Sequence, residues 1–140
     1  MNEINEIIEF LGKGAAFSIA TVDENNHPQV RPFSFVMEWN GKLTFVTAKP
    51  KPVYKQIRKN PVIAITLFDG GSGKWIRISG NVKFTDEESA RKKVFEVAPN
   101  LIDLYPKGHE NPDIACFYIE KGEAQIYSFA KHTPEKEIRF

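Results

Sequence analysis

The sequence lacks the features typical of disulfide-bonded, membrane-spanning and nucleic-acid-binding proteins. A single cysteine, Cys116, among 140 residues excludes an intrachain disulfide and a cysteine-ligated metal cluster. The longest apolar runs are short, such as residues 62–65, so we expect no membrane-spanning segment. Nineteen basic and 18 acidic residues give a net charge of +1, which argues against nucleic-acid or membrane partners. The acidic start lacks an apolar signal region, so we expect a soluble, cytoplasmic protein.

The sequence also lacks the common catalytic sets. His27, His109 and His132 do not fall at metal-ligand spacing, so no metal site is expected. There is no phosphate-binding P-loop, no dinucleotide fingerprint and no residue beside Ser72 that would activate a nucleophile. Cys116 lies within an expected strand and is expected to pack as a small apolar residue. No catalytic residue can be assigned, and an enzyme built from this chain would take its chemistry from a cofactor.

The hydrophobic patterns predict a mainly β protein with helices, of the α+β class. Ile4, Ile7, Ile8 and Leu11 share one helical stripe, and Thr85 starts a capping box before a second long helix. Expected strands outnumber helices and do not alternate with them, which favours an antiparallel sheet closed into a small barrel with flanking helices. We expect one domain over residues 1–130 and a charged, loose tail over 131–140. The expected strands are 15–22, 29–38, 42–48, 62–68, 74–84, 114–120 and 124–129, with a short helix over 52–59.

The segment 47–59 concentrates positive charge, with five cationic side chains and no acid. Lys49 and Lys51 flank the expected helix start, where the helix dipole disfavours cations unless an anion lies between them. Free N–H groups and lysines at a helix start suit a phosphate group, and Thr47 would add a hydroxyl donor. The alternative is a solvated basic helix face.

Two further side chains suit a cofactor. Arg31 lies in a strand beside Pro32 and can reach a phosphate with two parallel hydrogen bonds; the alternative is a surface salt bridge. Trp75 begins the polar face of the strand 74–84 and can stack on a planar ligand; the alternative is packing at a barrel mouth or a subunit contact. A phosphate-bearing, flat aromatic cofactor fits these residues, and flavin mononucleotide (FMN) is such a molecule.

The ordered segments of this chain resemble the pyridoxamine 5′-phosphate oxidase-related flavoproteins, the FMN-binding split-barrel family. The resemblance covers roughly residues 5–130 and implies a six-stranded split barrel that works as a homodimer with FMN at the interface. It implies that Arg31 and Lys51 hold the phosphate, that Thr47 contacts the flavin region and that Trp75 lies beside the ring. The full expected cofactor set is Arg31, Pro32, Phe33, Ser34, Thr47, Lys49, Lys51, Pro52 and Trp75. The segments that carry the resemblance are 17–23, 30–33, 41–47, 49–52, 57–62, 75–80 and 126–129.

Two departures bear on the expected reaction. Val36 stands where pyridoxamine phosphate oxidases carry a second basic residue, and residues 131–134 lack their terminal Arg and His pattern. We therefore expect an FMN-dependent oxidoreductase of unknown substrate rather than a pyridoxamine phosphate oxidase proper. Two alternatives stay open: a non-catalytic flavin or haem binder for storage or sensing, and an oligonucleotide-binding barrel, against which the near-zero net charge argues.

Overall fold

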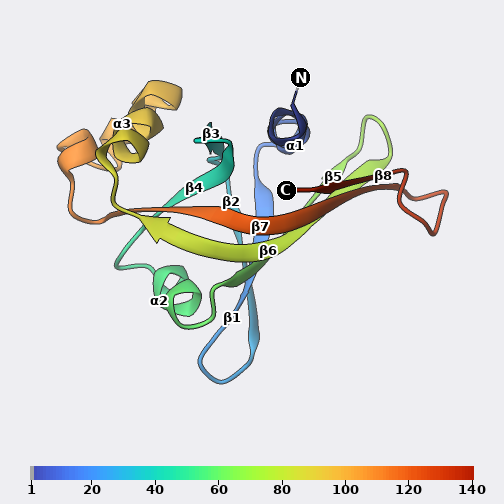
Figure 1. The fold of residues 1–140 in the computed structure, drawn as a ribbon, viewed down its shortest axis with the longest axis horizontal. Helices are drawn as coiled ribbons and strands as arrows, with labels where there is room; N and C mark the ends of the chain where they lie inside the picture. The colour runs from blue at the N-terminus through green and yellow to red at the C-terminus, as the bar shows by residue number, and fades with distance from the viewer. Residues whose placement is uncertain (1) are drawn as a thin grey trace.

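The computed structural model describes residues 2–140 as one antiparallel sheet with helices packed against it. In Figure 1 the long ribbon of β6 and β7 crosses the view, with α1 and α3 above it and α2 below. The sheet order is β2-β1-β5-β6-β7-β4-β3, and β8 pairs with β7. The elements are α1 Glu3–Leu11, β1 Phe17–Val22, β2 Pro28–Phe33, β3 Met37–Trp39, β4 Lys42–Ala48, α2 Pro52–Lys59, β5 Val62–Asp69, β6 Lys74–Thr85, α3 Glu88–Val97, η1 Pro99–Asp103, η2 Gly108–Glu110, β7 Ile114–Ser128 and β8 Lys136–Arg139.

The expected α+β class with an antiparallel sheet is confirmed, with eight strands rather than six. The strand expected over 29–38 is interrupted at residues 34–36. β2 and β3 lie at opposite ends of the strand order, so these three residues carry the chain from one edge of the sheet to the other. The sheet therefore stays open along this side, and the closed barrel expected from the strand pattern is wrong: the barrel is split here.

The strands expected over 114–120 and 124–129 form one continuous strand, β7. Gly80 of β6 pairs with Gly122 of β7 beside a register shift. A Cβ on Gly80 would lie 2.6 Å from Cγ2 of Ile119 and 2.7 Å from the Lys121 carbonyl oxygen. The two facing glycines therefore let the strands approach closely, and pairing continues where the sequence suggested a turn.

The core lies on the inner face of the sheet. β1 and β6 alternate buried and outward residues, as their sequences predict. Phe45 and Phe117 stack at 5.3 Å between ring centres in the middle of this core. A second cluster under α3 contains Met37, Val94 and Tyr105. Residues of β4 belong to both clusters, Phe45 to the first and Val46 to the second, so this strand is packed on both faces.

Two local predictions differ from the structure. Thr85 Oγ1 accepts a hydrogen bond from the Glu87 amide at 3.2 Å, but α3 begins at Glu88 without a side-chain cap, so the expected capping box is not formed. The segment expected to be a loose tail ends in β8, where Ile138 is buried against β7. Among residues 2–140, no helix combines the length and apolarity needed to cross a bilayer.

Candidate cofactor site

A cavity of about 170 Å³ lies where β2, β4, α2 and η1 meet. No acidic side chain lines it. It brings together six of the nine residues expected to bind a cofactor, so residues far apart in the sequence converge on one place. Its lining consists of Arg31, Pro32, Phe33, Ser34, Phe35, Val46, Thr47, Lys51, Val53, Leu101, Leu104 and Tyr105.

The start of α2 forms the cationic corner of this cavity. β4 ends at Ala48, and Lys51 takes the N-cap position with extended backbone before Pro52. No side chain caps this helix end, and its first turn carries no acid. The partial positive charge of the helix start is therefore not neutralised by the helix itself, and Lys51 adds a full charge beside it.

Arg31 reaches the same corner from β2 and is half-buried. Its Nη1 donates to Thr21 Oγ1 at 2.8 Å and to the Ile19 carbonyl oxygen at 3.3 Å. Its Nη2 donates to Gln56 Oε1, which also accepts from the Thr21 hydroxyl at 2.7 Å. Burial lowers the pKa of Arg31. Because its acceptors within residues 2–140 are all neutral, the surface salt bridge considered for Arg31 is not formed, and its charge remains available to an anion.

Thr47 carries a buried hydroxyl without a partner in the protein. The residue is 2% exposed and is one of those that line the cavity. Among the side-chain atoms of residues 2–140, this Oγ1 is the only buried oxygen or nitrogen without a hydrogen-bond partner. A buried hydroxyl without a partner is destabilising by about 1–3 kcal/mol, so such a group calls for an explanation. A ligand oxygen in the cavity would provide one.

The opposite wall was not predicted from the sequence. Leu101, Leu104 and Tyr105 come from η1 and the turn after it, and Phe35 comes from the crossing between β2 and β3. The only sequence signal was the run 101–105, Leu-Ile-Asp-Leu-Tyr, which predicted one more helical turn. Nothing in that run indicates that it folds back over the end of β4.

Three expected site residues lie outside this cavity. Lys49 lines a separate hollow with Tyr54 and Arg58, on another side of α2. Trp75 lies on the outer face of the sheet and stacks on Tyr127 at 4.5 Å between ring centres. Within one chain, these residues do not share a site with Arg31.

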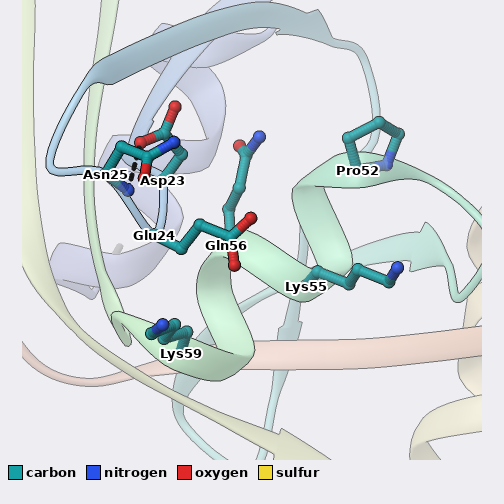
Figure 2. A pocket seen from close by; sticks show the side chains of 7 residues that line it. All are labelled: Asp23, Glu24, Asn25, Pro52, Lys55, Gln56 and Lys59. Carbon is teal, nitrogen blue, oxygen red and sulfur yellow. Dashed lines mark hydrogen bonds between the residues drawn. The ribbon is translucent and has the colours of Figure 1, made fainter.

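Pro52, the third residue outside the cavity, lines a larger hollow of about 260 Å³ between α2 and the β1–β2 turn (Figure 2). Lys55 and Lys59 line it together with Asp23 and Glu24, so its charges offset one another. The Asp23 carboxylate accepts from the His27 and Asn25 amides, and these hydrogen bonds hold the pKa of Asp23 below its usual value. This hollow is therefore a weaker anion site than the smaller cavity.

The fold and the acid-free corner define the class: an open, antiparallel split barrel with a cationic cavity at the end of β4. The family model for pyridoxamine 5′-phosphate oxidase matches residues 4–125. The chain therefore belongs to the pyridoxamine 5′-phosphate oxidase family. The curated proteins contain no sequence match to it.

Solved structures agree with this fold. A NimC/NimA family protein from Clostridium acetobutylicum is 31% identical with a TM-score of 0.88, and the match covers 100% of this chain and 95% of that one. A pyridoxamine 5′-phosphate oxidase-related, FMN-binding protein from Nostoc punctiforme is 17% identical with a TM-score of 0.71, covering 96% and 86%. An F420 reductase is 20% identical with a TM-score of 0.60, covering 79% and 89%. The last two show similarity of fold.

Proposed function

We propose that the protein binds FMN and acts as an FMN-dependent oxidoreductase. The observation that carries this proposal is the buried, unpartnered hydroxyl of Thr47, a residue that lines an acid-free cavity together with Arg31 and Lys51. A phosphate-bearing ligand supplies both the negative charge and the acceptor oxygens that these groups lack. The FMN-binding relative and the F420 reductase support a flavin-type ligand.

Each residue has a defined part in this site. Arg31 and Lys51 bind the phosphate, Thr47 donates its hydroxyl to the ligand, and the backbone of residues 31–34 borders the flavin edge. Bound FMN supplies hydride-transfer chemistry, which no side chain lining the cavity provides. The protein's own contribution is to anchor and orient the cofactor and to shield it from water.

A second copy of the chain completes the proposed site. A cavity of about 170 Å³ is smaller than the roughly 300–1,000 Å³ of a usual ligand pocket, so the flavin ring must extend beyond it. The outer face of β5 exposes Val62, Ala64, Thr66 and Phe68. Phe68 packs on the exposed Phe129 at 4.9 Å between ring centres. Covering this apolar face with a partner protomer would bury it and bring the partner's copy of the Trp75–Tyr127 pair towards the cofactor.

The absorption spectrum of the freshly purified protein tests the proposal. We expect a flavin spectrum, with FMN released on denaturation. The double variant Arg31→Ala, Lys51→Ala loses two charge-assisted contacts of about 1.5–3 kcal/mol each, so its FMN affinity is expected to fall at least 100-fold. The matched control Lys55→Ala, Lys59→Ala removes the same charge from exposed positions of α2 and is expected to retain FMN. Equal FMN affinity in the two double variants would refute the site.

Turnover separates an oxidoreductase from a flavin-binding protein without activity. We expect NADH or NADPH to reduce the bound flavin in stopped-flow mixing, and oxygen or a nitroaromatic compound to oxidise it again. If no common electron donor reduces the tightly bound flavin, the protein binds flavin but is not an oxidoreductase.

A further inference from the structure

The two ends of the cavity differ in chemistry. One end holds Arg31, Lys51 and the Thr47 hydroxyl, which the proposed function assigns to the cofactor phosphate and the flavin region. The remaining lining positions carry no charged side chain: Pro32, Phe33, Ser34, Phe35, Val46, Val53, Leu101, Leu104 and Tyr105. A substrate with its own anionic group would therefore find no second cation in this cavity.

The residues of the segment 99–105 that line the cavity, Leu101, Leu104 and Tyr105, form a largely apolar wall, while Asn100 and Asp103 of the same segment are exposed and do not line it. Leu104 lines the cavity and is also 72% exposed, and the neighbouring Ile102 is 47% exposed. Leu101 continues this surface inward. Exposed apolar side chains that line a cavity mouth favour an apolar ligand, because contact removes their surface from water.

Among the residues of this segment that line the cavity, Tyr105 is the one with a polar side-chain group. The residue is only 8% exposed and packs in the second core cluster. No hydrogen bond of its hydroxyl is formed within residues 2–140, and this oxygen is not among the fully buried unpartnered ones, so it is accessible to a ligand or to water. Burial raises the pKa of Tyr105, so the phenol keeps its proton at neutral pH and can donate it to an acceptor.

The chain that follows the wall is held firmly against α3. Arg91 Nε donates to the His109 carbonyl oxygen at 2.8 Å, and its Nη1 donates to that of Ile114 at 3.1 Å. Its Nη2 donates to the Asn111 carbonyl oxygen, and the Asn111 amide donates to that of Pro106 at 2.8 Å. These hydrogen bonds hold the chain from Pro106 to Ile114, directly after the wall, and a wall anchored at its end can select a ligand by shape and polarity.

We propose that the segment 99–105 is the substrate-binding wall and that the substrate is an uncharged, largely apolar molecule. The substrate carries a single hydrogen-bond acceptor, to which the Tyr105 hydroxyl donates. This inference rests on the proposed function, because it assigns the cationic end of the cavity to the cofactor. It makes Leu104 and Tyr105 the residues that determine specificity.

Two unreactive probes test the proposal: acetophenone, which is neutral, and 4-acetylbenzoate, which adds one carboxylate. Both are titrated into the FMN-loaded protein without an electron donor, and binding is followed by the flavin absorption change and by calorimetry. We expect the wild-type protein to bind acetophenone more tightly. Leu104→Lys places a cation on the exposed wall and is expected to shift the affinity ratio towards 4-acetylbenzoate by about fivefold. Leu104→Met is the control and keeps the wild-type ratio.

Tyr105→Phe keeps the ring and removes only the hydroxyl. We expect it to weaken acetophenone binding about fivefold, the effect of one hydrogen bond, while FMN affinity and the melting temperature stay close to wild type. Tighter binding of 4-acetylbenzoate by the wild-type protein, or an unchanged ratio in Leu104→Lys, would overturn the substrate wall and leave FMN binding intact. If the wild-type protein does not bind FMN, the proposed function fails. Calorimetry of the flavin-free protein with both probes then tests separately whether the wall prefers the neutral probe.

Discussion

Replacing Gln56 with glutamate changes the charge beside Arg31 while keeping the shape of the side chain. Gln56 Oε1 accepts hydrogen bonds from Arg31 Nη2 and from the Thr21 hydroxyl. A carboxylate at this place would accept the same two hydrogen bonds and also form an ion pair with the guanidinium. Gln56 is thus a positioning residue: it orients Arg31 without neutralising it.

Gln56→Glu is expected to weaken FMN binding but to raise the stability of the flavin-free protein. If the new ion pair takes up the charge of Arg31, the phosphate loses one charge-assisted contact of about 1.5–3 kcal/mol, which weakens FMN binding about 10- to 150-fold. The ion pair at this half-buried position is expected to raise the free energy of unfolding of the flavin-free protein by up to about 1 kcal/mol. A variant that is more stable and binds its cofactor less well cannot be explained by damage to the fold.

Fluorescence quenching of FMN during titration measures the affinity, and thermal unfolding of the flavin-free protein measures the stability. Lys59→Gln is the matched control, since it changes the net charge by the same amount at an exposed position near the other end of α2. The reasoning is refuted if Gln56→Glu binds FMN as tightly as wild type, or if Lys59→Gln weakens binding equally.

Three further variants test separate parts of the structure. Thr47→Val replaces the unpartnered buried hydroxyl with a methyl group. The free energy of unfolding of the flavin-free protein, measured by denaturant, is therefore expected to rise by about 1 kcal/mol while FMN affinity falls. A loss of stability would mean that the hydroxyl already has a hydrogen-bond partner. Hydrogen bonds from the Gly41 amide, the larger cause, and from the Lys93 side chain hold the pKa of Glu38 below its ordinary 4.5. The charged Glu38 therefore contributes to the free energy of unfolding above pH 4.5, and this contribution is lost as the pH falls through the lowered pKa. The free energies of unfolding measured at pH 3 and pH 6 are therefore expected to differ less for Glu38→Gln than for wild type. Equal differences in the two proteins would contradict the stabilising role of the charged Glu38. Ile138→Ala is expected to lower the free energy of unfolding by about 2–5 kcal/mol, because β8 is part of the sheet; a change below about 0.5 kcal/mol would mean that the segment is loose after all.

Local patterns in the sequence predicted much of the fold. The alternation of β6 and the helix stripe of Ile4 and Ile7 each report which face of an element is buried, and the structure confirms both. The continuity of β7 could not be predicted in this way, because Gly122 looks like a turn residue until Gly80 is known to face it. β8 was missed for a similar reason, since a short charged strand gains its stability only from pairing with β7.

The candidate site was predicted in part. Arg31, Thr47 and Lys51 carry chemical signals of their own, a cation in a strand or a hydroxyl and a cation at a helix start, and these three residues meet in one cavity. The apolar wall opposite them depends on where the segment 99–105 folds back, which is set by long-range packing under α3. Trp75 lies on the outer face of the sheet, and its expected place beside the flavin stays a prediction that depends on a second copy of the chain.

The most direct test of the anion site is to titrate the flavin-free protein with FMN and with riboflavin, which differs by the absence of the phosphate. If Arg31 and Lys51 bind the phosphate, calorimetry is expected to give an affinity for FMN that exceeds the affinity for riboflavin by at least 100-fold, and the difference is expected to disappear in the Arg31→Ala, Lys51→Ala variant. Equal affinities of the wild-type protein for the two flavins would contradict the account.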